Sequence, residues 1–326
     1  MARGLFMAAA SGALAMYMPT CVPPAVLPTV PPGQVRIAEL WEEPTDIGGQ
    51  DLFYGPWGPE RAPDPEATYT FIETKQGGVN PGMTVRDPAG RKWKVKQPPL
   101  VGRRAEGPIE VVLSRVLSAV GYHQPPVYYL RAFTVADDSG TRRTVGGRFR
   151  LSDPSLKDVG EWSWQQNPFV GTRPYQGLLV ILLMFNSSDL KNSNNTLYEL
   201  RSSTARTERW YVVRDLGTAL GGTGRFTPAR GDLDAFERSG FIEGVEDGFV
   251  EFEYHGWHQE LIRRRLTPAD VRWACELLAE LTDTQWREAF LAGGYDPAVS
   301  ARFIQRLQAK IREGAALGTV AGGPAS

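Results

Sequence analysis

The sequence has few of the residues on which disulfide frameworks and histidine-rich metal centres depend. Its 326 residues include two cysteines, Cys21 and Cys275, and only three histidines. Two cysteines cannot form a disulfide framework or a cysteine zinc site, and three histidines disfavour a histidine-rich metal centre. The composition, 42% hydrophobic and 22% charged, is that of a globular chain with room for one large or two modest domains.

The chain also has almost no net charge and lacks two common catalytic motifs. With 36 basic and 37 acidic residues the net charge is −1, so overall charge provides no attraction to nucleic acid, and no nucleic-acid partner is expected. There is no Gly-Lys dipeptide, which excludes a P-loop. There is no G-x-S-x-G, which removes the usual hydrolase elbow. Lysine is scarce, seven against 29 arginines, so a lysine inside a motif is informative.

The N-terminus holds the only long uncharged stretch. Arg3 precedes an apolar run from Gly4 to Met18, and no charged residue occurs between Arg3 and Arg36. This pattern predicts that residues 1–20 are a signal peptide or an uncleaved membrane anchor, although the run is short for a spanning helix. A disordered or buried N-terminal helix is the alternative. The prediction places the protein outside the cell or at the cell envelope, with membrane attachment through its N-terminus.

The rest of the chain divides by composition and periodicity. Residues 21–67 are rich in proline and glycine and are expected to form a stiff linker. We then expect a β-rich N-terminal lobe over 68–150, a mainly helical C-terminal lobe over 151–314 and a flexible tail over 315–326. This is an α+β plan with two lobes.

Local patterns give the order of the elements. Strands are expected at 69–74, 83–86 and 92–97, a helix at 109–120, and strands at 126–135 and 141–149. The second half should contain a nearly all-apolar helix at 175–185, which must be buried. A polar loop at 186–195 and a hairpin of 196–200 with 210–214 follow. Three helices, at 268–281, 283–292 and 297–313, complete the chain.

Two short motifs in the second half carry candidate chemistry. The polar loop reads Asp189-Leu190-Lys191-Asn192-Ser193-Asn194, and the hairpin ends in Asp215-Leu216-Gly217. Phosphoryl transfer needs a carboxylate beside the acceptor hydroxyl, oxygen ligands for Mg²⁺ and a lysine that binds the phosphates. The two motifs and an upstream lysine would supply this set.

These motifs resemble the protein-kinase-like superfamily. Its catalytic loop has an aspartate, often a lysine two residues on, and an asparagine five residues on, as at Asp189, Lys191 and Asn194. The Asp-Leu-Gly that begins at Asp215 is similar to the superfamily's metal-binding Asp-Phe-Gly. The resemblance implies that Asp189 is the base or orienter for the acceptor and that Lys191 neutralises transferred charge. Asn194 and Asp215 would bind Mg²⁺ or Mn²⁺.

The resemblance extends upstream, over roughly residues 68 to 220. Lys96 ends a predicted strand where the superfamily has its phosphate-anchoring lysine, and Glu110 on the next helix is similar in placement to its glutamate partner. Gly77 and Gly78 lie in the turn that would cover the phosphates of ATP. Two nearby lysines, Lys92 and Lys94, compete for the role of Lys96. In the same way, Glu106 could replace Glu110.

Departures from the common pattern favour the atypical branch of the superfamily, which includes HipA-type, secreted Golgi-type and lipid-kinase-like enzymes. Ser187 and Ser188 stand where His-Arg is usual, and the glycine turn is not G-x-G-x-x-G. The expected function is an atypical kinase that transfers the γ-phosphate of ATP to an unknown hydroxyl of a protein or small molecule. The alternative is a non-catalytic kinase-like binding or scaffold protein of the cell envelope. Transfer of an adenylyl group from the same cleft also stays open.

Overall fold

A computed structural model describes residues 36–75, 80–99, 106–201, 207–224 and 230–318. The predicted signal segment 1–20, the glycines Gly77 and Gly78 and the tail from residue 319 onward lie outside these residues. Among the described helices, none combines the length and the apolar character that crossing a membrane requires.

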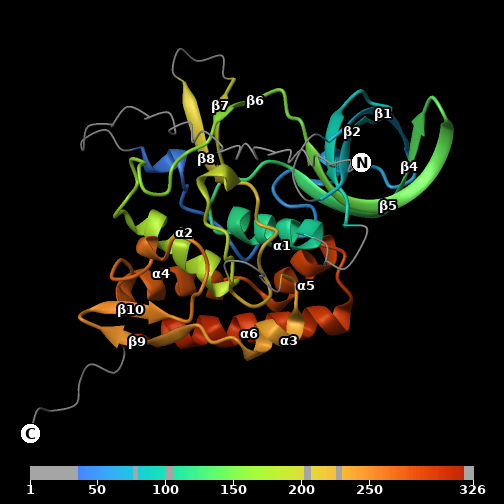
Figure 1. Ribbon diagram of the computed structural model, residues 1–326. Coiled ribbons are helices and arrows are strands. Elements are labelled where there is room, and N and C mark those ends of the chain that lie inside the picture. The colour runs from blue at the N-terminus through green and yellow to red at the C-terminus, as the bar shows by residue number, and fades with distance from the viewer. Residues whose placement is uncertain (1–35, 76–79, 100–105, 202–206, 225–229, 319–326) are drawn as a thin grey trace, which may run out of the picture.

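The first half of the chain forms a closed five-stranded barrel with one helix beside it (Figure 1). The strand order is β1-β2-β3-β5-β4, and the barrel closes through parallel pairing of β1 with β4. Helix α1 (Glu106–Ala119) connects β3 to β4. The strands are β1 (Thr68–Thr74), β2 (Gly82–Arg86), β3 (Lys92–Lys96), β4 (Val127–Asp137) and β5 (Gly140–Leu151).

Alternation along two of these strands separates an apolar interior from a charged exterior. Trp93 and Val95 of β3 are buried in the barrel together with Phe149 of β5, so the residues between them point to the opposite face. The register pairs Lys94 with Arg150 and Lys96 with Arg148. Four cationic residues therefore share one outer face of the barrel.

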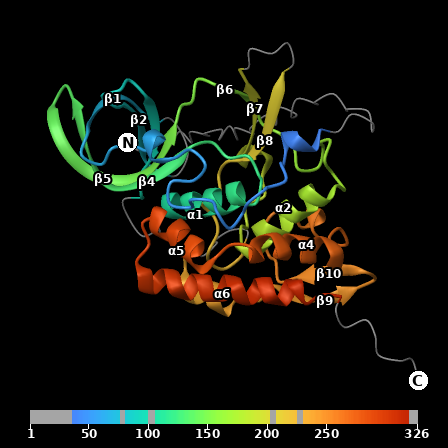
Figure 2. The same ribbon diagram turned by 180° about the vertical axis from the view of Figure 1, so that it is seen from behind.

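The second half contains most of the helices, which lie on one side of α1 (Figures 1 and 2). Helix α2 is buried as predicted: all residues from Gly177 to Met184 are buried. The helices are α2 (Arg173–Met184), α3 (Leu233–Arg238), α4 (Pro268–Ala279), α5 (Asp283–Ala292) and α6 (Pro297–Ala315). Capping boxes at Thr267 and Thr282 fix the starts of α4 and α5.

Two small antiparallel sheets complete the described chain. One has the order β6-β7-β8 and the other is a hairpin of β9 and β10. Their strands are β6 (Leu156–Gly160), β7 (Asn195–Leu200), β8 (Glu208–Val213), β9 (Ile242–Glu246) and β10 (Phe249–Phe252). The β7–β8 hairpin was predicted; β6, β9, β10 and α3 were not. The mixed helix and strand content confirms the α+β class.

Residues 36–67 do not form the spacer that their proline and glycine content suggested. Leu40, Ile47 and Leu52 are at most 2% exposed and belong to the main core. The side-chain amide of Gln285 on α5 donates to the carbonyl of Ile47 at 2.6 Å. Apolar residues at intervals let this segment cover α1 and α5, so the compact unit begins before Thr68.

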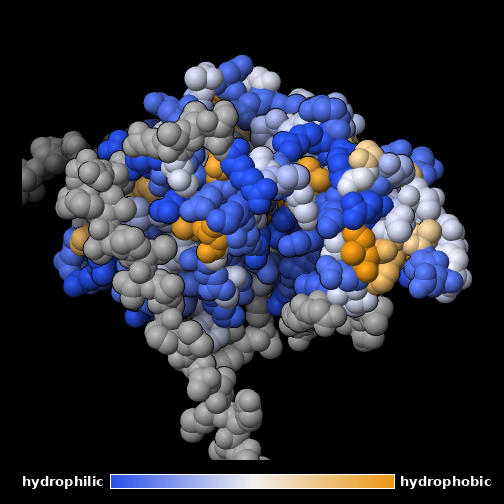
Figure 3. Space-filling model, turned by 90° about the horizontal axis from the view of Figure 1, so that it is seen from above, coloured by the Kyte–Doolittle hydropathy of each residue, from blue (hydrophilic) through white to orange (hydrophobic). Residues whose placement is uncertain are grey.

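The surface seen from above is mostly hydrophilic, with apolar residues in small groups (Figure 3).

Candidate functional site

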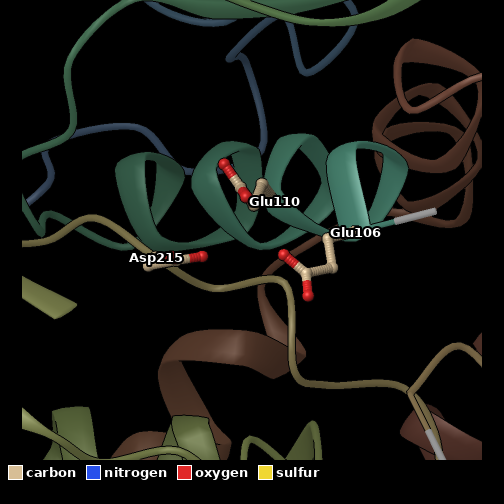
Figure 4. A group of neighbouring side chains, drawn as sticks. All are labelled: Glu106, Glu110 and Asp215. Carbon is tan, nitrogen blue, oxygen red and sulfur yellow. The ribbon is translucent and has the colours of Figure 1, made fainter. Parts of the chain in front are cut away.

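Lys96 lies at the end of β3 with its ammonium group among three carboxylates. Its Nζ is 2.6 Å from Oε2 of Glu106, 2.6 Å from Oε1 of Glu110 and 3.0 Å from Oδ1 of Asp215. Lys96 and both glutamates are buried, whereas half of the Asp215 side chain is exposed. The two glutamates are one turn apart on α1, and Asp215 comes from the segment after β8 (Figure 4). Both glutamates considered from the sequence therefore contact this lysine.

Glu110 also joins the cationic face of the barrel. Its Oε2 accepts from Nε of Arg148 at 2.8 Å and from Arg150 at 3.4 Å. Burial would raise the pKa of Glu110, but Arg148, Lys96 and Arg150 outweigh burial and hold that pKa well below its usual range. Glu110 is thus a buried, ionised carboxylate that three cations share.

Glu106 connects the same lysine to two other segments. Its Oε2 accepts from the side-chain amide of Asn80 at 2.5 Å as well as contacting Lys96, and its other carboxylate oxygen pairs with Arg230. Asn80 follows directly on the segment that contains Gly77 and Gly78. Glu106 therefore links α1 to the end of the predicted phosphate-covering turn.

The segment Asp215-Leu216-Gly217 approaches α1 closely. A Cβ atom built on Gly217 would lie 2.5 Å from Cβ of Glu106, so only glycine lets the backbone pass at this distance. Leu216 is buried in the core. The buried leucine and the close-packed glycine fix the path of the chain that presents Asp215 to Lys96.

The second motif, at Asp189, forms a loop after α2. Lys191 Nζ lies 2.9 Å from Oδ1 of Asp189 and 5.1 Å from the ring centre of Trp257. The buried Leu190 anchors the loop in the core, and the backbone N–H of Trp257 donates to the carbonyl of Ser188 at 3.0 Å. The Asp189 carboxylate is thus partly open to solvent beside a cation.

Asn194 joins the two motifs. Its side-chain Nδ2 donates to the carbonyl of Asp189 at 2.6 Å, and its own carbonyl accepts from the backbone N–H groups of Arg214 and Asp215 at 2.8 and 3.2 Å. The structure thereby brings Asp189, Asn194 and Asp215 into one hydrogen-bonded unit. It records no direct contact of Lys96 with Asp189.

Two sets of oxygen ligands are candidate metal sites: the three carboxylates around Lys96 and the predicted pair of Asn194 and Asp215. Glu106, Glu110 and Asp215 have carboxylate oxygens within 4.8 Å of one another. However, the ammonium group of Lys96 contacts all three, so a lysine already balances these charges. This group is an ion-pair cluster in the described chain and does not need a metal.

The predicted pair, Asn194 and Asp215, offers a side-chain amide oxygen and a carboxylate, which are donor types suited to a divalent cation. Because Nδ2 of Asn194 donates to Asp189, the amide is oriented with its oxygen free of that bond. Oδ2 of Asp215 has no hydrogen-bond partner among the described residues, and the side chain is 49% exposed. Carboxylate and amide oxygens are the ligands that Mg²⁺ prefers. The donor set is therefore suitable for Mg²⁺ or Mn²⁺.

A pocket of about 430 Å³ opens on the cationic face of the barrel. Six of its eleven lining residues are lysines or arginines: Lys75, Lys94, Lys96, Arg148, Arg150 and Arg214. Burial, followed by the charge of Lys96, lowers the pKa of Lys75. Burial and the neighbouring Arg148 lower the pKa of Arg150 to about 9. The concentration of six basic side chains in one pocket favours binding of a polyanion.

All of the predicted site residues except Gly77 and Gly78 lie within the described part of the chain. The structure brings Lys96, Glu110 and Asp215 into contact, and it brings Asp189, Lys191 and Asn194 together in a loop whose Asn194 backbone is hydrogen-bonded to Asp215. The sequence did not predict the part that Arg148, Arg150 and Asn80 take in this site. The alternation Arg148-Phe149-Arg150 could have indicated a one-sided cationic strand, but only the strand register shows that this strand lies beside Lys96.

Comparison with known proteins adds little to this geometry. No protein-family model matches the chain, and no curated protein matches it. Among solved structures, the chain is similar to the proinflammatory kinase CtkA of Helicobacter pylori, with 10% sequence identity and a TM-score of 0.35 over 76% of this chain and 98% of CtkA. At this TM-score the likeness carries no weight, and the function must be argued from the site.

Proposed function

We propose that this chain is a kinase-like phosphotransferase of atypical type that uses ATP and a divalent cation. The observation that carries the proposal is the contact of Lys96 with both Glu110 and Asp215, together with the strongly cationic pocket that Lys96 also lines. A triphosphate carries up to four negative charges, and six basic side chains line a pocket large enough for it.

In this proposal the residues of the barrel and α1 bind the nucleotide. Lys96 donates to phosphate oxygens, and the ionised Glu110 holds its ammonium group in place. Arg148 and Arg150 keep Glu110 ionised and add positive charge to the pocket. Gly77 and Gly78 would cover the phosphates with backbone N–H groups, although both lie outside the described residues.

The divalent cation would be held by Asn194 and Asp215, and it would neutralise charge on the β- and γ-phosphates. On binding the cation, Asp215 would exchange its contact with Lys96 for one with the metal. Lys96 would then be free to donate to phosphate. The half-exposed Asp215 side chain allows this exchange, whereas the buried Glu110 stays with the lysine.

Asp189 would face the acceptor. The acceptor oxygen forms a bond to the γ-phosphorus as the bond to the bridging oxygen of ADP breaks, and the hydroxyl proton passes to Asp189. Lys191, 2.9 Å from Asp189, would neutralise charge on the transferred phosphoryl group. The acceptor is a hydroxyl of a protein or small molecule.

The alternative is a kinase-like protein of the cell envelope that binds a ligand without catalysis. The presence of every polar part expected from the motifs within the described residues supports the catalytic proposal. Adenylyl transfer would use the same binding groups with the nucleotide reversed. Its product distinguishes it from phosphoryl transfer, because AMP and not phosphate is attached to the acceptor.

The proposal is tested by titrating the full-length protein with ATP in the presence and absence of Mg²⁺. A ligand at one hundred times its dissociation constant stabilises a protein by about 2.7 kcal/mol, which gives a clear melting shift. We expect Asp215→Asn to lose the Mg²⁺-dependent part of the shift. The exposed turn residue Asp138→Asn is the matched control and should behave as wild type. An equal Mg²⁺-dependent shift in wild type and Asp215→Asn would remove Asp215 from the metal site.

A further inference from the structure

A second pocket, of about 370 Å³, lies apart from the candidate site. It shares no lining residue with the cationic pocket. Its walls come from residues 53–65 of the N-terminal segment, from α1, from β4 and from the end of α5. Figure 2 shows this N-terminal segment, in blue, running beside α1 and the barrel. Four of the lining residues are aromatic: Phe53, Tyr54, Tyr128 and Tyr129.

Arg115 of α1 contributes the one basic side chain of this pocket. The residue is 1% exposed, and its guanidinium carbon lies 4.8 Å from the ring centre of Trp57 and 5.1 Å from that of Tyr128. Its Nε donates to the carbonyl of Phe53 at 3.2 Å. Nη1 is buried and has no hydrogen-bond partner among the described residues.

A buried guanidinium normally has a carboxylate partner, because an isolated buried charge is costly. No described acidic group lies within ion-pair distance of Arg115. Among the carboxylates, the charge of Asp51 acts on Arg115, but its Oδ1 already accepts from the backbone N–H groups of Phe53 and Tyr54. The two aromatic rings stabilise the faces of the guanidinium, but they leave Nη1 unsatisfied.

Burial lowers the pKa of Arg115 to about 10, so the side chain stays charged at neutral pH. The pocket therefore combines apolar walls, aromatic rings and one cation with an unused donor. Small-molecule sites have this composition: mostly apolar surface with a few polar groups that fix orientation. Asp64, the one acidic lining residue, is exposed and accepts from the backbone N–H of Glu66.

We propose that this pocket is a binding site for a small aromatic carboxylate, with the ring between the aromatic walls and the carboxylate on Arg115. One carboxylate matches the single guanidinium, whereas a phosphate would bring a second charge that no lining residue neutralises. The volume suits a ligand of one or two rings. Bound there, the ligand contacts the N-terminal segment, α1 and β4 at once.

The test uses a matched pair of probes on the full-length protein: indole-3-acetate and the uncharged indole-3-acetamide. Binding is measured by isothermal titration and by ligand-observed NMR. We expect the carboxylate to bind at least tenfold more tightly than the amide, the size expected for one charge-assisted hydrogen bond. Equal affinities for the two probes, or no binding of either at millimolar concentration, would overturn the proposal.

Variants locate the site. Arg115→Met should remove the preference for the carboxylate, while Arg131→Met, on the exposed side of β4, should keep it. Ala62→Trp should abolish binding of both probes by filling the pocket with Arg115 intact, which keeps the test decisive if Arg115→Met does not fold. A carboxylate preference that persists in Arg115→Met, or binding that persists in Ala62→Trp, would place the probe elsewhere and refute the proposal.

Discussion

The ammonium nitrogen of Lys96 lies 2.6 Å from Oε1 of Glu110, and both side chains are buried. The two residues belong to β3 and α1 and are 14 positions apart in the sequence. Arg148 and Arg150 contact the other carboxylate oxygen, so the glutamate balances three cations at once. The cost of burying this group is offset only while all members are present. The predictions below follow from this charge balance.

Glu110→Gln should destabilise the fold strongly. The change keeps the size of the side chain but removes the charge that Lys96, Arg148 and Arg150 share, and breaking a buried ion pair typically costs about 3–5 kcal/mol. Urea denaturation measures this loss. The control is Glu199→Gln, whose exposed pairs with Lys157 and Arg209 should contribute little to stability because solvent screens them. Similar losses in both variants would contradict the role assigned to Glu110.

Glu110 should also make stability sensitive to acid. Its folded pKa is held below the ordinary value of 4.5, so the unfolded chain binds the proton first. The contribution is therefore fully present above about pH 4.5 and is lost as the pH falls through the lower, folded pKa. The free energy of unfolding of wild type should fall faster below pH 4.5 than that of Glu110→Gln. Parallel pH profiles would show that Glu110 is not preferentially ionised in the folded state.

Lys96→Met should weaken ATP binding by about tenfold or more, since one charge-assisted contact to phosphate contributes about 1.5–3 kcal/mol. The matched control is Lys92→Met. Lys92 lies four residues before Lys96 on the same strand, is exposed, and does not line the pocket. Isothermal titration with Mg²⁺-ATP compares the two. Equal affinity losses would mean that the strand acts through its general positive charge and not through Lys96.

Gly217→Ala should disturb both stability and metal-dependent binding. The added methyl group would lie 2.5 Å from Cβ of Glu106, so the segment that carries Asp215 has to move, at a cost of about 1–3 kcal/mol. Gly244→Ala is the control, because a Cβ there meets no atom within 4 Å. Thermal melting with and without Mg²⁺-ATP measures both effects, and a neutral Gly217→Ala would refute the close approach.

Lys310 of α6 should make stability rise with pH in the alkaline range. It is fully buried, and its Nζ donates to the carbonyl of Met184 and to Oδ1 of Asn186. Burial, and then the charge of Arg306, lowers its pKa to about 7 from 10.5.

Between these two values the unfolded chain binds more protons than the folded one, so the free energy of unfolding should increase with pH, by up to about 1.4 kcal/mol per unit. Below about pH 7 the contribution of Lys310 to the free energy of unfolding does not change with pH. Urea denaturation from pH 6.5 to 9.5 should show the rise in wild type and not in Lys310→Met. A rise of equal size in both would assign it to other groups.

The sequence predicted the strands of the barrel, α1, α2 and the three C-terminal helices because their apolar periodicity is strong. Strand β6 was not predicted because its residues are mostly exposed, with little alternation to detect. The sequence wrongly predicted a linker over residues 36–67. Only three widely spaced apolar residues, Leu40, Ile47 and Leu52, pack into the core there, among many prolines and glycines. Tertiary contacts, not local pattern, order this segment.

The candidate site was predictable where one motif carries several residues. The loop from Asp189 to Asn194 and the segment from Asp215 to Gly217 could each be found by spacing. Arg148 and Arg150 could not, because their role depends on the register of β5 against β3. Arg115 was also missed, since a lone arginine in an apolar helix gives no signal until the rings of Trp57 and Tyr128 are placed beside it.

The central claim is that this chain transfers phosphate with Asp189 beside the acceptor, and one measurement tests it most directly. Full-length wild type and Asp189→Asn are incubated with γ-labelled ATP and Mg²⁺, with the protein itself and an envelope extract as acceptors. ATP affinity is measured in parallel. We expect transfer by the wild type, a fall of about 100-fold or more in Asp189→Asn, and unchanged ATP affinity, because Asp189 makes no proposed contact with the nucleotide. Equal transfer by the two proteins would refute the role of Asp189, and ATP binding without transfer by the wild type would contradict the catalytic account.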